Sequence, residues 1–323
     1  MPVSRLSSGG IIANYRCPAA CGHCLYGCSP SAQPGYINED MTVRLCGQLR
    51  RLGCRSLHIG GGEPFLDIEG LIGLIKIIRK SGIQLDYIET NAAWITGDDA
   101  RNRRILSEVV NAGGECVMVS ADPFHIEFIP FWKPKKLIRL LREMGISHFI
   151  WQERYLPLLE RLDPEKTYDG QTLHDIFGYD VQQHCAAEYG MRFGGRALNL
   201  LRKYGEKKTI TPPSKPCPEL SNTSHFHVDY LGRYIPPGCT GMGILLEDLD
   251  NELDPVKYPV LSRLFRRGLD GLLKYAQALG YRLDSGGYVS KCGLCFDIRK
   301  FLVTSDRQGH PDLTPESFYK QDF

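Results

Sequence analysis

The most constraining feature of this 323-residue sequence is an alternation of short apolar runs with longer amphipathic stretches. Short runs rich in Val, Ile and Leu indicate strands, and stretches with apolar residues every three or four positions indicate helices. The predicted strands are 10–13, 56–59, 85–90, 116–121, 148–151 and 191–193, and the predicted helices are 38–52, 68–80, 98–111, 134–144 and 181–189. About six strand–helix units predict an α/β fold with a parallel sheet, either an incomplete barrel or a doubly wound sheet.

Glycines and polar residues follow several of the predicted strands. Because the carboxyl ends of parallel strands meet at one edge of a sheet, we expect these residues to gather there and to form the functional site. The residues concerned are Gly61, Gly62, Glu63, Thr90, Asn91, Ser120 and Asp122, with Glu89 in the same segment as Thr90.

The chain after residue 206 follows a different pattern. The segment 207–217 is rich in proline and lysine, which indicates a linker. Two short runs, 225–229 and 233–235, predict a β-hairpin, a helix is expected over 260–279, and the last 30 residues are expected to form a partly ordered tail. We therefore expect two domains, 1–206 and a small α+β domain over 207–323.

Charge and hydropathy exclude several classes of protein. Lys and Arg number 39 against 37 Asp and Glu, so nothing predicts a surface for nucleic acid. The longest apolar stretch, 71–78, is too short to cross a bilayer, and the N-terminus has no apolar signal-peptide core. We expect a cytoplasmic protein without a membrane partner.

Cysteine is abundant, with 12 residues, and three of them form a C-x3-C-x2-C run. Chance would give such a triple roughly 0.02 times in a chain with this cysteine content. The thiolates of Cys17, Cys21 and Cys24, in the loop after the first strand, can hold a zinc ion or an iron–sulfur cluster. Cys28 follows closely, so a closed site with four thiolates is the alternative, as in a structural zinc knuckle.

The pairing of this cysteine run with Gly-Gly-Glu-Pro after the second strand resembles the radical S-adenosylmethionine (radical SAM) superfamily. The resemblance covers roughly residues 9–200 and implies a partial (β/α)6 barrel. It implies that Cys17, Cys21 and Cys24 bind a [4Fe–4S] cluster whose open iron binds SAM. One electron would then cleave SAM to a 5′-deoxyadenosyl radical that abstracts a substrate hydrogen. Cys28 would be a nearby free thiol.

The resemblance also implies contacts with SAM. Glu63 would accept a hydrogen bond from the SAM ammonium, and Gly61 and Gly62 would let the backbone approach the ligand. His23 would lie beside adenine. The strand-end residues expected to contact the methionine and ribose parts of SAM are Thr90, Asn91, Ser120 and Asp122.

Three further residues near strand ends are candidates. Arg154 follows the fifth strand and Arg196 the sixth, and either guanidinium could bind a carboxylate of SAM or substrate. A surface ion pair is the alternative for each. His125 could act as a base or a hydrogen-bonding group toward the substrate, and a local loop contact is its alternative.

A second set of cysteines lies in the C-terminal part. Cys217, Cys239, Cys292 and Cys295, with a hairpin after the first, are similar to the start of SPASM and twitch domains, which bind auxiliary iron–sulfur clusters. Four cysteines suffice for one auxiliary [4Fe–4S] cluster, which would transfer electrons. A structural zinc site is the alternative. His225 and His227 share one face of the hairpin, where a core or surface role is expected.

These inferences together predict a radical SAM oxidoreductase or maturase. We expect it to modify a ribosomally synthesised peptide, by epimerisation or crosslinking, with flavodoxin or ferredoxin as reducing partner. A dehydrogenase for a small molecule, or an enzyme of cofactor biosynthesis, is the first alternative. A non-catalytic iron–sulfur electron carrier is the second. Cys185 could donate a hydrogen atom to a substrate radical, although a buried structural role is favoured.

Overall fold

The protein was analysed as a computed structural model that describes residues 3, 5–188, 194–305 and 309–320. Its centre is one sheet of eight strands in the order β5-β4-β3-β2-β1-β6-β7-β8. The first five strands are parallel to one another. They are β1 (Ser8–Ile12), β2 (Ser56–Gly60), β3 (Gln84–Thr90), β4 (Cys116–Ser120) and β5 (Ser147–Trp151).

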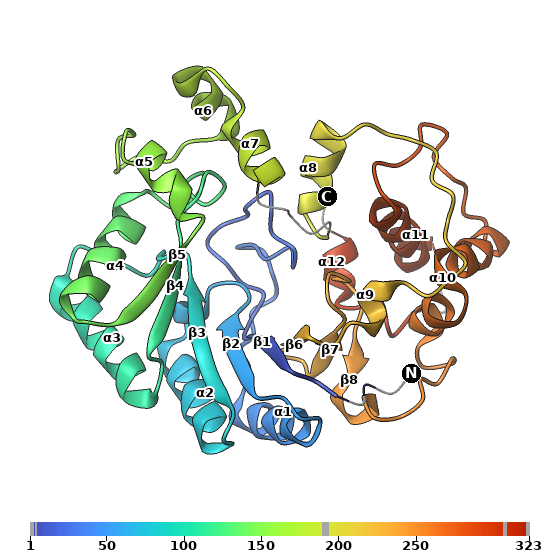
Figure 1. The fold of residues 1–323 in the computed structure, drawn as a ribbon, viewed down its shortest axis with the longest axis horizontal. Helices are drawn as coiled ribbons and strands as arrows, with labels where there is room; N and C mark the ends of the chain where they lie inside the picture. The colour runs from blue at the N-terminus through green and yellow to red at the C-terminus, as the bar shows by residue number, and fades with distance from the viewer. Residues whose placement is uncertain (1–2, 4, 189–193, 306–308, 321–323) are drawn as a thin grey trace.

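Helices connect these strands along one side of the sheet (Figure 1). The side chains of Asn38, Asp67 and Asp98 each accept a hydrogen bond from the backbone N–H three residues later, and so begin three of the helices. Gly113, with a left-handed φ of 114°, ends the third. The four helices are α1 (Glu39–Arg51), α2 (Ile68–Lys80), α3 (Asp99–Ala112) and α4 (Trp132–Glu143).

The positions of the helices distinguish between the two predicted architectures. From β1 to β5 each strand lies beside its predecessor, and α1 to α4 cover one face of these strands (Figure 1). A doubly wound sheet has helices on both faces, so this arrangement favours the incomplete barrel. In the described part of the chain the sheet ends at β5 and β8, which are not paired with each other. The predicted sixth strand, 191–193, lies outside the described residues.

The sheet continues into the C-terminal part. Strand β6 (His225–Asp229) pairs in parallel with β1, while β7 (Arg233–Ile235) and β8 (Ile244–Leu245) follow in antiparallel order. The predicted hairpin is therefore confirmed with its bounds. The expected boundary at residue 206 does not separate two sheets, because β6 joins the two parts through backbone hydrogen bonds with β1.

The expected tail is wrong. The last part of the chain contains α11 (Lys291–Ser305) and α12 (Glu316–Tyr319). Leu294, Ile298 and Leu302 recur every four residues on α11 and are fully buried, as is Tyr319 on α12. This apolar spacing is helical, so the sequence carried the signal for α11 among its polar residues.

The helix expected over 260–279 is observed as α10 (Pro259–Ala278), with a break at Gly268. Gly268 has a φ of 60°, and a Cβ there would lie 2.2 Å from the Lys215 carbonyl oxygen. The break therefore lets the proline-rich segment pack closely against α10. The remaining elements are η1 (Pro64–Leu66), η2 (Glu153–Tyr155), α5 (Leu156–Leu159), α6 (Gly170–Phe177), α7 (Val181–Glu188), α8 (Ala197–Tyr204), α9 (Pro218–Ser221) and η3 (Leu246–Asp248).

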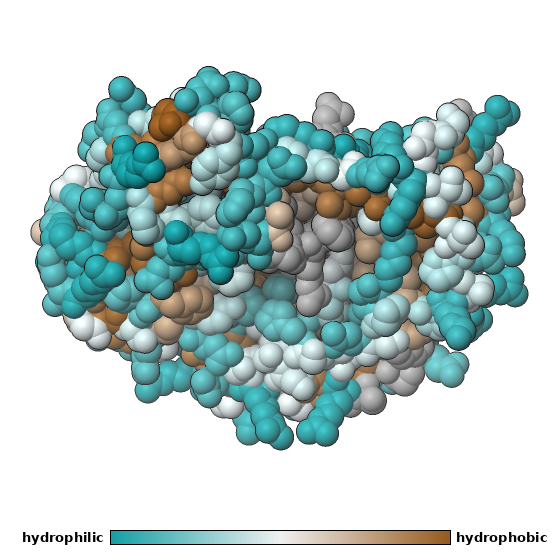
Figure 2. Space-filling view, turned by 45° about the horizontal axis from the view of Figure 1, so that its top comes forward, coloured by the Kyte–Doolittle hydropathy of each residue, from teal (hydrophilic) through white to brown (hydrophobic). Residues whose placement is uncertain are grey.

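The face of the molecule in Figure 2 is mostly hydrophilic, with hydrophobic residues in small groups around a central hollow. The described chain contains no helix with both the length and the apolar character needed to cross a membrane.

Candidate functional site

A cleft lies at the carboxyl ends of β1 to β4, where the sequence predicts a site. It is lined by residues from the loop after β1, from the ends of the next three strands, and by Glu89, His125 and Arg196. The predicted site residues that line it are Cys17, Cys21, His23, Cys24, Gly61, Gly62, Thr90, Asn91 and Ser120. Glu63, Asp122 and Arg154 are not part of this lining.

The cysteine loop after β1 surrounds one end of the cleft. Cys17 and Cys21 are buried, and the Asn91 side-chain amide donates a hydrogen bond to the Cys17 sulfur at 3.3 Å. The thiols of Cys24 and Cys28 are hydrogen-bonded to each other. No disulfide involves any of these cysteines, which are all free thiols.

The distances between these sulfurs distinguish a site for one zinc ion from a site for an iron–sulfur cluster. Around a tetrahedral zinc ion, with Zn–S bonds of about 2.3 Å, sulfurs lie about 3.8 Å apart. Within the described residues, no three cysteine sulfurs lie within 4.8 Å of one another. The loop is therefore not arranged as a closed zinc site, whereas a larger cluster of several irons suits a wider ring of thiolates. The donor set thus fits an iron–sulfur cluster.

The cysteines of the loop differ in acidity. The hydrogen bond from Cys28 outweighs burial and lowers the pKa of Cys24 to about 5, with Arg196 contributing. Burial raises the pKa of Cys17 to about 12. The lowered pKa makes Cys24 the most readily ionised cysteine of the loop. Since the thiolate is the form that binds metals, Cys24 is the thiol best prepared to bind one.

Arg196 holds the cysteine loop in place. Its Nε donates a hydrogen bond to the Cys21 carbonyl at 3.0 Å, and its Nη2 donates to the Cys28 carbonyl. Its backbone N–H donates to the Cys24 carbonyl at 3.1 Å. The sequence predicts Arg196 as a carboxylate ligand, but these bonds direct its guanidinium to the backbone of the loop.

Glu63 lies beneath the cleft rather than on its wall. Its Oε1 accepts hydrogen bonds from the Phe65 N–H at 3.1 Å and the Thr90 hydroxyl at 2.9 Å, and its Oε2 accepts from the Asn91 N–H at 2.8 Å. Burial outweighs these bonds and raises the pKa of Glu63 to about 7. The carboxylate therefore fixes the end of β3. Glu63 is fully buried, and its predicted hydrogen bond from the SAM ammonium stays a prediction.

The two glycines before Glu63 serve the cysteine loop. The Gly62 N–H donates to the Asn14 carbonyl at 2.8 Å, and the Glu63 N–H donates to the Arg16 carbonyl at 3.0 Å. A Cβ on Gly62 would lie only 1.9 Å from the Arg16 carbonyl oxygen. Gly61 and Gly62 line the cleft as predicted, but the structure adds this second reason for glycine: close packing of the loop on the end of β2.

Asp122 acts through a neighbouring histidine. Its Oδ2 lies 2.9 Å from Nδ1 of His125 and 3.9 Å from Nε2 of His23. Burial disfavours both charges, yet their mutual attraction lowers the pKa of Asp122 and raises that of His125. Burial lowers the pKa of His23 to about 4, so this ring is neutral, and it stacks on Phe124 with ring centres 4.8 Å apart. His125 thus lies in the lining of the cleft with its Nδ1 held by Asp122.

Glu89 also lines the cleft. The sequence places it at a strand end beside Thr90 but gives it no specific role. Burial raises its pKa to about 7. A Cβ on Gly60 would lie 2.5 Å from Glu89 Oε2, so glycine at the end of β2 makes room for this carboxylate. The alternation of side chains along a strand could have predicted this position. Ile88 and Thr90 are buried on one side of β3, so Glu89 between them points to the other side.

Arg154 does not join the other predicted residues. Its side chain is exposed, and its Nη1 forms an ion pair with Glu188 Oε2 at 2.8 Å. The expectation that Arg154 lies at the cleft is therefore corrected: the alternative reading, a surface ion pair, describes its position. Cys185 is also outside the cleft lining; it is buried on α7 and hydrogen-bonded to Tyr155.

The second cysteine set gathers from three segments. Cys217 precedes α9, Cys239 follows β7, and Cys292 and Cys295 lie at the start of α11. Burial and the nearby thiols of Cys295, Cys292 and Cys217 raise the pKa of Cys239 well above its usual value. The structure thus brings together the four cysteines that the sequence predicts as one ligand set. As in the first loop, no three described sulfurs have the close spacing of a zinc site.

Arg299 supports this second set. Its Nη1 donates to the Thr240 carbonyl at 2.7 Å and to the Tyr319 hydroxyl at 2.8 Å, and its Nε donates to the Cys295 carbonyl at 3.4 Å. Arg299 and Tyr319 are both buried. The guanidinium therefore connects the loop after β7 with α11 and α12.

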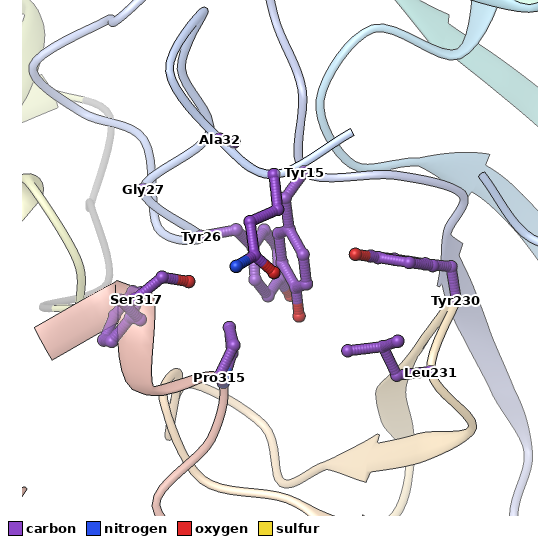
Figure 3. A pocket seen from close by; sticks show the side chains of 10 residues that line it. Tyr15, Tyr26, Gly27, Ala32, Tyr230, Leu231, Pro315 and Ser317 are labelled. Carbon is purple, nitrogen blue, oxygen red and sulfur yellow. The ribbon is translucent and has the colours of Figure 1, made fainter. Parts of the chain in front are cut away.

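A small pocket marks the junction between the cysteine loop and the C-terminal part (Figure 3). Its volume of about 30 Å³ is room for about one water molecule. Tyr15 and Tyr26 line one side, and Tyr230 and Pro315 line the other. The Tyr15 hydroxyl donates to Asp229 Oδ2 at 3.1 Å, which ties the loop to the end of β6.

No family model and no curated protein matches this chain. Among solved structures, native anSMEcpe with bound AdoMet is 17% identical and has a TM-score of 0.44, over 76% of this chain and 79% of that one. SuiB from Streptococcus suis bound to S-adenosylmethionine is 14% identical, with a TM-score of 0.47 over 90% and 77% of the chains. BtrN in complex with AdoMet and 2-DOIA is 14% identical, with a TM-score of 0.42 over 82% and 89%.

Proposed function

We propose that this protein is a radical SAM enzyme. The observation that carries the proposal is the meeting of three thiols from one loop with the polar ends of β2, β3 and β4 around one cleft. Cys17, Cys21 and Cys24 would hold a [4Fe–4S] cluster there. Such a cluster supplies the electron that cleaves SAM and yields a 5′-deoxyadenosyl radical able to abstract a substrate hydrogen.

The residues around the cleft have separate tasks in this proposal. Asn91 donates a hydrogen bond to the Cys17 sulfur, which stabilises thiolate charge at that atom. Arg196 fixes the loop through the carbonyls of Cys21 and Cys28. Glu63 holds Thr90 and the Asn91 backbone, so that the end of β3 presents the same polar groups to a ligand.

Polar groups on the cleft wall would orient SAM and substrate. His125, whose Nδ1 lies 2.9 Å from Asp122 Oδ2, would offer a ring N–H to a carboxylate. Glu89 would accept a hydrogen bond from an ammonium group, the role that the sequence predicts for Glu63. A donor and an acceptor thus line one cleft, as the carboxylate and ammonium groups of an amino acid ligand require.

The second cysteine set would hold an auxiliary [4Fe–4S] cluster. The convergence of Cys217, Cys239, Cys292 and Cys295, without the close spacing of zinc ligands, supports this assignment. Four protein ligands leave no iron for substrate, so the task of this cluster would be electron transfer. A reducing protein such as flavodoxin or ferredoxin would supply electrons to the enzyme.

A ribosomally synthesised peptide is our proposed substrate class. The support is the second cysteine set, because auxiliary-cluster domains of the SPASM and twitch kind often accompany peptide modification. The test is a comparison of peptide and small-molecule candidates for SAM-dependent mass change. A candidate peptide that changes mass only with SAM and reductant would support this class, and turnover of small molecules alone would replace it.

The radical SAM proposal is tested by electron paramagnetic resonance of the reduced, anaerobically reconstituted chain. We expect the addition of SAM to change the signal of one cluster, since SAM would bind an open iron. The Cys292→Ala plus Cys295→Ala variant should keep this response, and the Cys17→Ala variant should lose it. A signal that is insensitive to SAM at saturating concentration would contradict the proposal.

A further inference from the structure

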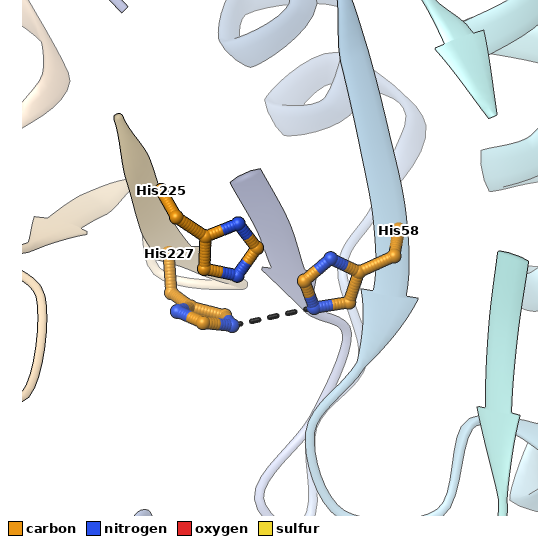
Figure 4. Close-up of side chains that lie close together, drawn as sticks. All are labelled: His58, His225 and His227. Atoms are coloured by element: carbon orange, nitrogen blue, oxygen red, sulfur yellow. Dashed lines mark hydrogen bonds between the residues drawn. The ribbon is translucent and has the colours of Figure 1, made fainter. Parts of the chain in front are cut away.

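Three histidines meet on one face of the sheet, beside the cysteine cleft (Figure 4). His58 lies on β2, and His225 and His227 lie on β6; β1 runs between them. Gly10 of β1 pairs in register with His58 on one side and with His227 on the other. Adjacent residues in register point to the same face of a sheet, so the two rings approach each other over Gly10.

Glycine is required at position 10 for this approach. A Cβ on Gly10 would lie 2.3 Å from Nε2 of His58 and 2.6 Å from Cδ2 of His227. Any other residue would therefore push the rings apart. The backbone of β1 thus leaves a gap that the imidazoles of its two neighbours fill.

The ring nitrogens are close to the spacing of metal ligands. Nε2 of His58 and Nε2 of His227 lie 3.3 Å apart, and one nitrogen from each of the three rings lies within 4.8 Å of the others. With metal–nitrogen bonds of about 2.0–2.1 Å, tetrahedral ligands lie about 3.4 Å apart. The first pair already has this spacing. His225, which is exposed, stacks on His58 with ring centres 5.3 Å apart and planes 6° apart, so its ring must turn as well as shift to direct a nitrogen at the same ion.

Neighbouring residues orient the buried member of the group. Tyr87 stacks on His58 with ring centres 4.9 Å apart and planes 9° apart. The His58 ring is also hydrogen-bonded to the backbone of Gly9. Metal-binding histidines commonly have such an outer contact, which fixes the orientation of the ring.

The group also adjoins the cysteine cleft. Oε1 of Glu89 lies 3.5 Å from Nε2 of His58, and Glu89 lines the cleft. Glu89 thus contacts both the buried histidine of the group and the cleft. On the other side, exposed His225 gives access from solvent.

We propose that His58, His225 and His227 bind one divalent transition-metal ion, with Zn²⁺ as the expected type. Three imidazoles suit zinc and related first-row ions, and a set of three leaves a fourth position for a carboxylate or a substrate atom. Glu89 Oε1 lies 3.5 Å from His58 Nε2 but not within 4.8 Å of all three ring nitrogens, so the fourth position is left to water or a substrate atom. The ion places positive charge at the wall of the cleft, where an oxygen or nitrogen of a substrate can reach it. This site is independent of the iron–sulfur proposal.

The test uses the full chain with both cysteine sets loaded with iron and sulfide, so that thiols do not compete. After equilibrium dialysis against Zn²⁺, we expect about one zinc per chain. Zinc-edge X-ray absorption should give nitrogen or oxygen ligands at about 2.0–2.1 Å and no sulfur at about 2.3 Å. Zinc bound only through sulfur, or no zinc, would overturn the proposal.

Variants locate the ion. His58→Gln plus His227→Gln should abolish zinc binding and leave the iron content unchanged. Should that variant fail to fold, His225→Gln decides, because its side chain is exposed; it should weaken zinc binding more than about 10-fold, the lower end of what even outer contacts contribute. His174→Gln, at another exposed histidine on α6, is the matched control and should bind zinc like the parent. Equal affinity of His225→Gln and His174→Gln would refute the site.

Discussion

The two cysteine sets differ in how the chain brings them together. Cys17, Cys21 and Cys24 share one loop, whose path is set by local turns and by the glycines at the end of β2. The second set assembles only when the loop after β7 and the start of α11 meet. The first set is therefore visible as a motif in the sequence, while the second depends on tertiary structure.

Their surroundings differ as well, although each has an arginine that donates hydrogen bonds to cysteine carbonyls. Arg196 lies beside an open cleft whose walls carry Glu89 and His125. Arg299 is buried and contacts Tyr319 instead. All four cysteines of the second set are partly exposed, whereas Cys17 and Cys21 are buried. The two sets therefore differ in the arginine that holds them, which lies beside an open cleft in the first and is buried in the second.

The largest effect is expected from the first set. Replacing Cys17, Cys21 and Cys24 together with alanine should abolish SAM cleavage and remove about half of the iron, if each set holds one cluster of four irons. Iron analysis and quantification of 5′-deoxyadenosine measure both effects. Cys116→Ala, outside both sets, is the control and should change neither. SAM cleavage by the triple variant would refute the assignment of the first set.

The second set should give a partial effect. Cys292→Ala plus Cys295→Ala should remove the other half of the iron and stop product formation. SAM cleavage should survive in part, because the first loop is untouched. Elemental analysis of anaerobically purified parent protein is the complementary measurement. Zinc in place of iron at the second set would leave it a structural role only.

The two arginines should differ in their contribution to stability. Arg299→Met leaves the Thr240 carbonyl and the Tyr319 hydroxyl without their buried donor, so we expect the free energy of unfolding to fall by about 4 kcal/mol. Arg196→Met should cost less, about 1–2 kcal/mol, because water can reach the carbonyls beside the cleft. Anaerobic urea unfolding of both variants gives the comparison. Equal losses of unfolding free energy in the two variants would contradict the distinction between an arginine beside an open cleft and a buried arginine.

The smallest predicted effect concerns pH. The pKa of Glu63 rises from 4.5 to about 7 on folding, so the folded chain binds more protons than the unfolded chain between these values. Its contribution to stability is therefore present below pH 4.5 and is lost as pH rises to about 7, by at most about 3 kcal/mol. Arg299 stays charged throughout, so this arginine adds no such slope of its own.

Glu63→Gln is the variant that tests this slope. Glutamine cannot ionise, so the part of the pH dependence due to position 63 should disappear when the free energy of unfolding is measured from pH 4.5 to 8. Its amide also cannot accept from both sides as the carboxylate does, and one of the bonds from Thr90, Phe65 or Asn91 is lost. An unchanged slope would show that Glu63 does not titrate in this range.

Local patterns predicted much of the fold. Apolar runs and helical spacing placed the first five strands and their helices, because these signals act within a few residues. Strand order could not be predicted in the same way: β6 lies beside β1 although more than 200 residues separate them. α11 was missed because its apolar positions are interrupted by Cys, Lys and Arg.

The site was predicted in part for the same reason. Cys17 and Thr90 reach the cleft because they follow strands whose ends meet. The sequence predicts that Glu63 binds the SAM ammonium and that Arg196 could bind a carboxylate. Only the folded chain shows that both side chains form hydrogen bonds with the protein's own backbone. The meeting of His58 with His227 requires the pairing of β2, β1 and β6, which no local pattern contains.

The measurement that tests the central claim most directly is the formation of 5′-deoxyadenosine. The parent chain, reconstituted anaerobically with iron and sulfide and then reduced, is incubated with SAM, and a sample without reductant is the control. We predict 5′-deoxyadenosine and methionine in equal amounts, only in the reduced sample. Fully loaded and reduced protein that yields no 5′-deoxyadenosine, with or without candidate substrates, would contradict the account.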